Sequence, residues 1–467
     1  MGKEKIDTIC ALATAAGGAM ATIRVSGVQA IDITDALFVS PTGHRLADCR
    51  SHTAHYGSFC DDSSQTIDDV VVTLFRAPHS YTGEDTTEIS CHGSRYIISL
   101  ILQQLIKHGC RQARPGEFTQ RAFLNGKLDL SQAEAVADLI ASSNATTHKM
   151  AMSQLRGNFS HQLSELRDRL LHLTTLLELE LDFSDHEDLE FADRSELLQL
   201  AQATEQQIAT LSQSFATGKA LRQGIPVAII GKTNVGKSTL LNRLLHDDKA
   251  IVSDIHGTTR DVIEDTTQIG GATFRFIDTA GIRNTSDTIE RLGIERTYQK
   301  LDEAAIVLWL IDAPPTSEEV ADILNRTEDK KLIAVVNKID LNGPSAFKPF
   351  SSIASSDSNA DTIPVLEISA KHNQHLDALE DAIYQAADIP SITQNDVVVT
   401  SLRHFEALTK AHNAIHRVKE GLRSDLSGDL LSEDLRACID HLAEIVGGAI
   451  TPDETLENIF SHYCVGK

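Results

Sequence analysis

A glycine-rich segment of eight residues constrains the fold of this chain more than any other feature of its sequence. It reads Gly231-Lys-Thr-Asn-Val-Gly-Lys-Ser238 and stands between an apolar run, Val227 to Ile230, and a helical pattern, Thr239 to Leu245. In that setting, glycines let backbone N–H groups turn inward onto phosphates. Lys237 places a cation against the outer phosphates, and the hydroxyl of Ser238 can ligate magnesium. The segment therefore predicts an α/β nucleotide-binding domain.

Three shorter motifs follow in the order that guanine-nucleotide binding requires. Asp278-Thr-Ala-Gly281 comes after an apolar strand, so its carboxylate can hold magnesium through water. Asn337-Lys-Ile-Asp340 supplies a carboxylate whose two oxygens match two N–H groups of guanine, a pair that adenine lacks. Ser369-Ala-Lys371 offers a backbone N–H to the guanine carbonyl oxygen. Together with the glycine-rich segment, these motifs predict a domain that binds and hydrolyses GTP.

One expected catalytic residue is absent. Ras-type enzymes carry a water-orienting glutamine directly after the second motif, where this chain has Ile282. An apolar side chain cannot orient water, so a polar group from the following segment must do so if hydrolysis is to be fast. From the residues alone, Glu290 and Glu295 are equally suitable carboxylates.

Hydrophobic periodicity divides the rest of the chain. Residues 6 to 118 alternate short strand-like runs (Ala21 to Val25, Val70 to Phe75, Glu88 to Cys91) with one helical run, Ile97 to Lys107, and predict a small α/β domain. From Ser131 onward the spacing is helical, and the following five leucines share a face: Leu163, Leu166, Leu170, Leu173 and Leu177.

Residues 225 to 386 predict a parallel sheet with helical crossovers. The expected strands are Pro226 to Ile230, Thr273 to Ile277, Ala305 to Ile311, Leu332 to Val336 and Thr362 to Ile368. After Pro390 the helical pattern returns, with Leu435, Cys438, Ile439, Leu442 and Ile445 on one face. A helical domain interrupted by an inserted nucleotide-binding domain is the most economical interpretation, and two separate helical domains are the alternative.

Composition limits the class of protein. A net charge of -24 argues against a general nucleic-acid coat, because Lys and Arg supply affinity for phosphate backbones. The seven cysteines are scattered without a C-x-x-C pair that would indicate zinc or a redox couple, which favours a reducing compartment. Because no apolar stretch reaches the length of a membrane span and no signal-peptide run follows the charged first residues, we expect a cytoplasmic location without membrane attachment.

Several motifs far from the nucleotide segment are not explained by a generic GTPase. The nucleotide-binding domain itself resembles the translation-factor-related branch of the Ras-like GTPases, with Gly257-Thr-Thr-Arg-Asp261 as its first switch. Over its full length the chain resembles the MnmE (TrmE) family of tRNA modification GTPases. The further motifs that carry this resemblance are Tyr81-Thr-Gly-Glu-Asp85, Arg114-Pro-Gly-Glu-Phe118, Arg121-Ala-Phe-Leu-Asn125, Lys127-Leu-Asp-Leu-Ser-Gln-Ala-Glu134 and the tail Tyr463-Cys-Val-Gly-Lys467.

The resemblance implies three domains and a reaction. Residues 1–120 would form an N-terminal α/β domain that binds tetrahydrofolate and dimerises, residues 121–222 and 389–467 a discontinuous helical domain, and residues 223–388 an inserted Ras-like P-loop GTPase domain. As a homodimer in a heterotetramer with the FAD-dependent protein MnmG, such an enzyme installs an aminomethyl or carboxymethylaminomethyl group at C5 of uridine 34, the wobble base, in certain tRNAs. A 5-formyl- or 5,10-methylene-tetrahydrofolate would carry the one-carbon unit.

The resemblance also assigns residues around the nucleotide. Magnesium would be held by Ser238 and Thr259, and Glu290 would be the catalytic glutamate. A stimulating potassium ion would be bound by Asn234, Ser253, Ile255 and Thr258, although this chain has Ser253 where the family commonly has threonine. The full set expected to contact GTP, GDP and these ions is Asn234, Val235, Gly236, Lys237, Ser238, Thr239, Ser253, Asp254, Ile255, His256, Gly257, Thr258, Thr259, Asp278, Thr279, Ala280, Gly281, Asn337, Lys338, Asp340, Ser369, Ala370 and Lys371.

For the folate, the family pattern implies Arg24, Glu88, Lys127 and the terminal Lys467, with Cys464 as a candidate nucleophile. The tail reads Tyr-Cys-Val-Gly-Lys where Phe-Cys-Ile-Gly-Lys is common, which leaves the thiol in place. The competing hypothesis is a GTP-controlled assembly or ribosome-associated switch without one-carbon chemistry. Binding of a reduced folate separates the two.

Overall fold

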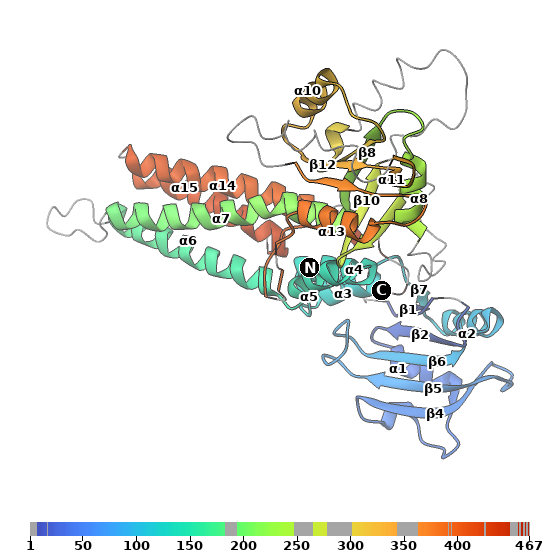
Figure 1. The fold of residues 1–467 in the computed structure, drawn as a ribbon. Helices are drawn as coiled ribbons and strands as arrows, with labels where there is room; N and C mark the ends of the chain where they lie inside the picture. The colour runs from blue at the N-terminus through green and yellow to red at the C-terminus, as the bar shows by residue number, and fades with distance from the viewer. Residues whose placement is uncertain are drawn as a thin grey trace, which may run out of the picture. The chain divides into compact units, whose positions relative to one another are not determined.

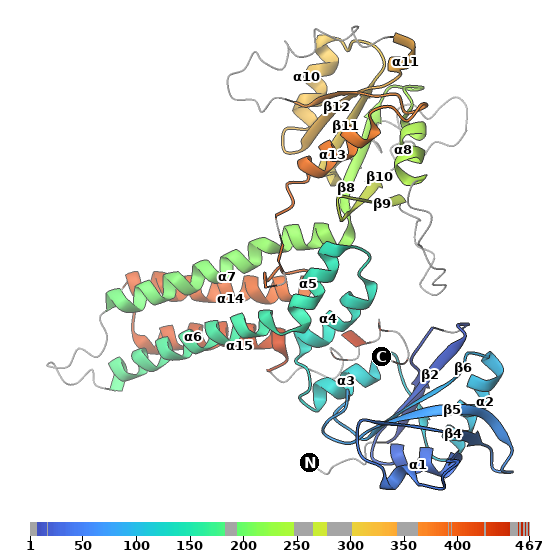
Figure 2. The ribbon, with the colours of Figure 1, turned by 60° about the horizontal axis from the view of Figure 1, so that its bottom comes forward.

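The computed structural model describes residues 7–15, 17–182, 194–246, 265–277, 301–342, 363–390, 392–393, 395–424 and 426–448, with residues 456, 459, 460, 463 and 466. By its internal contacts the chain divides into two compact units. The first comprises Met1–Ile140, Ser153–Gln206 and Ala407–Lys467, and the second Ala141–Met152 and Gln207–Glu406. Segments from before and after the second unit therefore belong to one unit. The elements of both are drawn in Figures 1 and 2.

The first unit begins with a seven-stranded sheet. Its strands run in the order β3 (Phe38–Val39), β4 (Thr53–Cys60), β5 (Thr66–Phe75), β6 (Thr86–His92), β2 (Met20–Ser26), β1 (Ile9–Leu12) and β7 (Arg111–Gln112). All neighbours are antiparallel except β1 and β7.

One face of this sheet packs on the helices α1 (Ala30–Leu37) and α2 (Arg95–Lys107). Alternate residues of β2 are therefore buried. The short 3-10 helix η1 (Leu46–Asp48) lies between β3 and β4 in the chain. The strands and the helix expected in this region are confirmed.

Further helices of the first unit are α3 Glu117–Leu124, α4 Leu130–Ala141 except its last residue, α6 Asn158–Asp182 and α15 Gly428–Val446. The division between the two units falls within α5 Ala145–Leu155, α7 Arg194–Gln223 and α14 Leu402–Arg423. The five leucines predicted to share one face of α6 are all buried. In α15, four of the five predicted residues are buried, and Ile439 is half-buried. Helix α6 packs along α15, so the two apolar stripes cover each other.

The second unit contains a six-stranded sheet in the order β13 (Val365–Glu367), β12 (Lys331–Val336), β11 (Ile306–Ile311), β8 (Ile225–Gly231), β10 (Ala272–Ile277) and β9 (Asp265–Ile269). The five expected strands are mutually parallel, which confirms the prediction. An additional strand that was not expected, β9, pairs antiparallel with β10 at the edge of the sheet. The two-residue turn Gly270–Gly271, in which both glycines have positive φ, makes that hairpin. The strand expected at Thr362 to Ile368 is also shorter, only three residues long.

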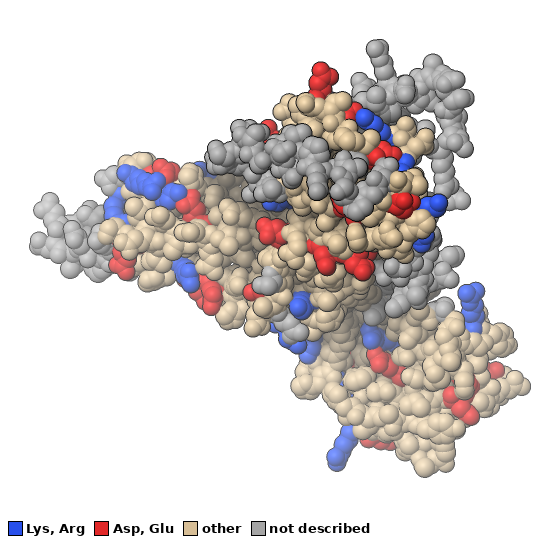
Figure 3. All heavy atoms as spheres, viewed as in Figure 1, with Lys and Arg blue, Asp and Glu red and all other residues tan. Residues whose placement is uncertain are grey.

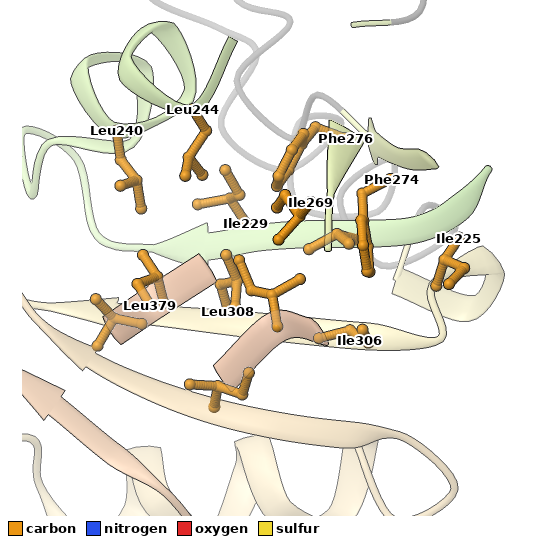
Figure 4. Close-up of a cluster of buried hydrophobic side chains, with 14 of the residues drawn as sticks. Ile225, Ile229, Leu240, Leu244, Ile269, Phe274, Phe276, Ile306, Leu308 and Leu379 are labelled. Atoms are coloured by element: carbon orange, nitrogen blue, oxygen red, sulfur yellow. The ribbon is translucent and has the colours of Figure 1, made fainter. Parts of the chain in front are cut away.

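Two apolar layers cover this sheet. Residues Ile225, Val227 and Ile229 of β8 pack beneath α8 (Lys237–His246) and α13 (Leu376–Ala386), a cluster drawn in Figure 4. Alternate residues Ala228 and Ile230 enter a second cluster that includes Val320 of α10 (Ser317–Arg326). Because β8 is buried on both faces, it reads as a continuous apolar run, as central parallel strands do.

Charge is distributed over the visible surface without segregation. In Figure 3, acidic and basic side chains are interspersed among the described residues on that face. Within the described ranges, no helix has both the length and the apolar character needed to cross a membrane.

Candidate functional site

The carboxyl ends of three parallel strands of the second unit carry the predicted nucleotide motifs. The chain leaves β8 at Gly231, β12 at Val336 and β13 at Glu367. Since these strands are parallel, the loops that follow them emerge at the same edge of the sheet. That edge is where ligands bind in open α/β sheets.

The loop between β8 and α8 has the backbone of a phosphate-binding loop. Asn234 and Gly236 both have positive φ, of 63° and 105°, a geometry in which successive N–H groups can form a concave anion site. A Cβ at Gly236 would lie 2.3 Å from Nδ2 of Asn337, so only glycine fits there. Ser238 and Thr239 are exposed in the first turn of α8, where the positive end of the helix dipole favours a bound anion.

Lys237 lies folded over this loop. Its Nζ donates to the carbonyl oxygens of Gly231, at 2.6 Å, and Lys232, at 2.8 Å. Burial lowers the pKa of the Lys237 ammonium group. The side chain thus supplies a partly desolvated cation at the mouth of the loop, which is the electrostatic environment that a triphosphate requires.

Asn337 joins the phosphate loop to the base-recognition loops. Its Nδ2 donates to the carbonyl of Val235 at 2.8 Å, and its Oδ1 accepts from the backbone N–H of Ala370 at 3.0 Å. The side chain is buried, with 3% exposed. Nearby, Lys338 donates from Nζ to the carbonyl of Asn234 at 2.6 Å and to Asp312 at 2.7 Å. Two neighbouring residues therefore hold three separate loops in one arrangement.

Asp340 is oriented by the third motif. Ser369 Oγ donates to Asp340 Oδ1 at 2.7 Å, and this hydrogen bond is the main reason that the pKa of the Asp340 carboxyl group lies below its usual value. The other oxygen lies 3.7 Å from Nε2 of His372. The carboxylate is thus ionised and positioned as an acceptor, as recognition of two guanine N–H groups requires. Lys371 belongs to the same loop, and its carbonyl accepts from Arg243.

Many of the expected site residues lie outside the described part of the chain. These are Ser253, Asp254, Ile255, His256, Gly257, Thr258 and Thr259 of the first switch, Asp278, Thr279, Ala280 and Gly281 of the second motif, the candidate catalytic residues Glu290 and Cys464, and Lys467. Their assignments stay predictions.

The first unit brings two of the predicted folate residues together. Arg24 and Glu88 stand opposite each other on β2 and β6, and Oε1 of Glu88 accepts from both Nε of Arg24, at 2.9 Å, and Nη2, at 2.8 Å. The guanidinium also lies 5.3 Å from the ring centre of Tyr81 and 5.6 Å from that of Phe118. Lys127 is instead bonded through Nζ to the carbonyl of Pro78 at 3.0 Å.

The unexplained motifs converge around this pair. Arg121 contacts Glu84 and Glu117, each at 3.2 Å, and Asn125 donates from Nδ2 to the carbonyl of Thr82 at 2.8 Å. The motifs themselves indicated no role for the rings of Tyr81 and Phe118, which come near Arg24 only because the chain folds back. Both aromatic residues stand within these motifs, and that was the signal available in the sequence.

The chain's tail reaches the same sheet. A Cβ on Gly466 would lie 2.1 Å from the carbonyl oxygen of Leu12, at the end of β1, and the φ of Gly466 is positive. This close approach of two backbones accounts for glycine at that position. Tyr463 donates from its hydroxyl to the carbonyl of Ala133 at 2.9 Å, which anchors the tail to α4.

Comparison with known proteins covers nearly the whole chain. The family model described as "GTP-binding protein TrmE N-terminus" matches residues 8–127, and the one described as "MnmE helical domain" matches residues 130–464. A Bacteroides fragilis protein named "tRNA modification GTPase MnmE" is 58% identical over 466 residues, which is 99% of each chain. A Phocaeicola vulgatus protein of the same name is 55% identical over 499 residues, again 99% of each.

Among solved structures, Era of Aquifex aeolicus bound to GDP and AlF4- is 31% identical, covering 40% of this chain and 66% of that one. The TM-score of 0.27 is too low to support any conclusion about this chain.

Proposed function

Because the chain belongs to the MnmE (TrmE) family of tRNA modification GTPases, we propose that it couples GTP hydrolysis to the modification of wobble uridine in certain tRNAs. Family membership establishes the coarser function: the protein is a GTP hydrolase that acts in tRNA modification, and it binds GTP or GDP with Mg²⁺. The domain boundaries at residues 120, 222 and 388 are part of the proposal.

The observation that carries the nucleotide part is the arrangement around Asn337. Its side chain links Val235 of the phosphate loop to Ala370 of the base loop, while Ser369 orients Asp340. In this arrangement Lys237 neutralises the outer phosphates and Asp340 selects guanine. Magnesium held at Ser238 would neutralise further charge on the phosphates, and the exposed position of that hydroxyl at the start of α8 suits this role.

Base selection is tested by Asp340→Asn. Guanine needs two acceptors, whereas an asparagine amide offers one acceptor and one donor, the pair that matches xanthine. We expect GDP affinity to fall by roughly 100-fold or more and xanthosine diphosphate to become the better ligand. Calorimetric titration with both nucleotides measures this, and unchanged preference for GDP would remove Asp340 from the base site.

Hydrolysis is proposed to depend on potassium and Glu290. Asn234 is exposed at the tip of the phosphate loop, as a cation ligand must be, and the remaining proposed ligands are Ser253, Ile255 and Thr258. A monovalent cation there would offset charge that develops between the outer phosphates. We expect faster turnover in potassium than in sodium, and loss of turnover with retained GTP binding in Glu290→Ala. Equal rates in the two salts would overturn the cation assignment.

The folate proposal rests on the surroundings of Arg24. A half-buried guanidinium near two aromatic rings suits a flat heterocycle with an anionic tail, and it is paired with Glu88, an acceptor for pterin N–H groups. Lys127, Lys467 and Cys464 complete the proposed site, which would deliver a one-carbon unit.

Calorimetry on the full-length protein with 5-formyl-tetrahydrofolate tests this site. We expect binding that Arg24→Met abolishes and that Arg95→Met, a change at the start of α2, leaves unchanged. If the unaltered protein takes up no folate, the GTP-controlled switch hypothesis gains over one-carbon chemistry.

The proposed biological setting is a cytoplasmic homodimer that forms a heterotetramer with MnmG and installs an aminomethyl or carboxymethylaminomethyl group at C5 of uridine 34. Nucleoside analysis of tRNA from cells without this protein tests it directly. Loss of the modified uridine, restored by the normal gene but not by a Lys237→Ala version, is the expected result. Unaltered tRNA nucleosides would contradict the role.

A further inference from the structure

Three side chains with metal-binding atoms meet in the first unit, far along the chain from the nucleotide motifs. His44 lies in the loop after β3, Cys49 is the residue after η1, and His55 lies in the strand β4. Their ligand atoms lie within 4.8 Å of one another. His44 Nε2 is 3.1 Å from His55 Nδ1, and Cys49 Sγ is 3.9 Å from the same nitrogen.

These separations are close to those around a tetrahedral zinc ion. With Zn–N bonds of about 2.0 Å and Zn–S bonds of about 2.3 Å, two nitrogens would be about 3.3 Å apart, and nitrogen and sulfur about 3.5 Å. The remaining pair of ligand atoms, on the exposed His44 and the half-buried Cys49, lies within 4.8 Å, so these two side chains must approach each other before all three atoms reach bonding distance.

A neighbouring residue fixes the tautomer of His55. The hydroxyl of Thr53 donates to the carbonyl of Arg50 at 2.6 Å, so its oxygen must accept from His55 Nε2, which lies 2.7 Å away. The proton of His55 is thus on Nε2, and the lone pair of Nδ1 is directed toward His44 and Cys49. An outer hydrogen bond that orients a ligand histidine in this way is characteristic of metal sites.

His44 can adapt to a bound cation. With His55 Nδ1 as an acceptor, His44 must donate from Nε2 across the 3.1 Å contact. Its other nitrogen, Nδ1, lies 3.0 Å from the hydroxyl of Ser40 and also contacts that of Thr42. Hydroxyls both donate and accept, so their oxygens can accept a hydrogen bond from Nδ1–H when Nε2 binds a metal.

We propose that His44, Cys49 and His55 bind one divalent late transition-metal ion, with Zn²⁺ the best match, and leave a fourth position for water. Such ions bind imidazole and thiolate ligands strongly, whereas Mg²⁺ and Ca²⁺ prefer oxygen ligands. On binding, the Cys49 thiol releases one proton to solvent, and the proton of His44 moves from Nε2 to Nδ1. The ion would tie the segment between β3 and β4 to the sheet.

Cobalt titration of the full-length protein tests the site. After chelator treatment, and with excess Mg²⁺ present to fill oxygen-rich sites, Co²⁺ should bind with one equivalent per chain and give a thiolate-to-cobalt charge-transfer band. Cys49→Ser should lose the band, whereas the matched control Cys60→Ser, another half-buried cysteine of β4, should keep it. Retention of the band in Cys49→Ser, or its absence from the unaltered protein, would overturn the proposal.

Zinc competition with a chromophoric chelator extends the test to the histidines. His44→Ala and His55→Ala should each weaken Zn²⁺ binding by more than about 100-fold, and Thr53→Val by roughly 10- to 100-fold. His172→Ala, which removes an exposed histidine of α6, should have no effect. Circular dichroism establishes that each variant is folded, and equal affinity in all four variants would refute the assignment.

Discussion

Removing the side chain of Asn337 tests whether the phosphate loop and the base loop act as one unit. In Asn337→Ala, the carbonyl of Val235 loses its amide donor and the N–H of Ala370 loses its acceptor. Only 3% of Asn337 is exposed, so water cannot readily replace its side chain as the hydrogen-bond partner of either backbone group. Each buried group left unsatisfied costs about 1–3 kcal/mol, which gives about 2–6 kcal/mol for the pair.

This loss should appear in both stability and affinity. Urea unfolding can be followed through the chain's single tryptophan, Trp309, which is buried in β11 of the same sheet. We take about half of the lost free energy of folding to reappear as the cost of ordering the two loops around the nucleotide. At about 1.4 kcal/mol for each factor of ten, GDP affinity then falls by roughly 5- to 150-fold. Calorimetric titration with GDP and Mg²⁺ measures the change.

Two further variants make the test specific. Asn337→Asp keeps the acceptor for Ala370 but sets a buried carboxylate oxygen against the carbonyl of Val235, so it should lose at least as much affinity and stability as Asn337→Ala. Asn325→Ala removes an exposed asparagine of α10 and serves as the control. If Asn337→Ala matched this control in both urea midpoint and GDP affinity, the reasoning that the side chain couples the two loops would be refuted.

Three other predictions follow from single side chains. Lys237→Ala should abolish GTP hydrolysis and weaken GTP binding, because it removes the partly desolvated ammonium group from the mouth of the loop; unchanged turnover in a phosphate-release assay would contradict this. Glu117→Gln should cost about 3–5 kcal/mol at neutral pH. Burial alone would raise the pKa of Glu117, but hydrogen bonds led by that from Arg111 lower it overall, so its stabilisation is complete above the unfolded-state pKa and is lost as pH falls through the lower folded value. Acid titration of the variant by circular dichroism should therefore show a shallower loss of stability than the unaltered protein. Leu170→Ala, at a fully buried position of α6, should destabilise by about 2–5 kcal/mol in thermal or urea unfolding, whereas Leu171→Ala, 41% exposed, should change little; equal effects would contradict the predicted face.

Much of the fold could be predicted from local pattern. The apolar run before Gly231 and the helical pattern after it correspond to β8 and α8, and the leucines of α6 form the buried face that their spacing predicted. The antiparallel strand β9 was missed because Asp265–Ile269 is rich in polar and threonine residues rather than apolar. The Gly270–Gly271 turn was the available signal for that hairpin.

The candidate site shows a similar division. Motif chemistry predicted that Asp340 and Ser369 serve one base, and the structure has them in direct hydrogen bond. Motif chemistry gave no reason to expect that Asn337 connects the loops, because this connection depends on the distance between two strand ends. The pattern of scattered cysteines likewise gave no reason to select Cys49. The neighbours of Cys49 are histidines, at spacings outside the common zinc patterns.

By itself, the sequence determined which segments become strands and helices and which chemistry each motif can perform, because periodicity and residue type act within a few residues. Tertiary structure alone decided which distant groups meet: Arg24 faces Glu88 because β2 pairs with β6 in one particular register, and His55 approaches Cys49 because a loop folds back on β4. Strand register and loop closure are set by the packing of the whole sheet, and a shift of one residue in the pairing of β2 with β6 would turn Arg24 and Glu88 to opposite faces.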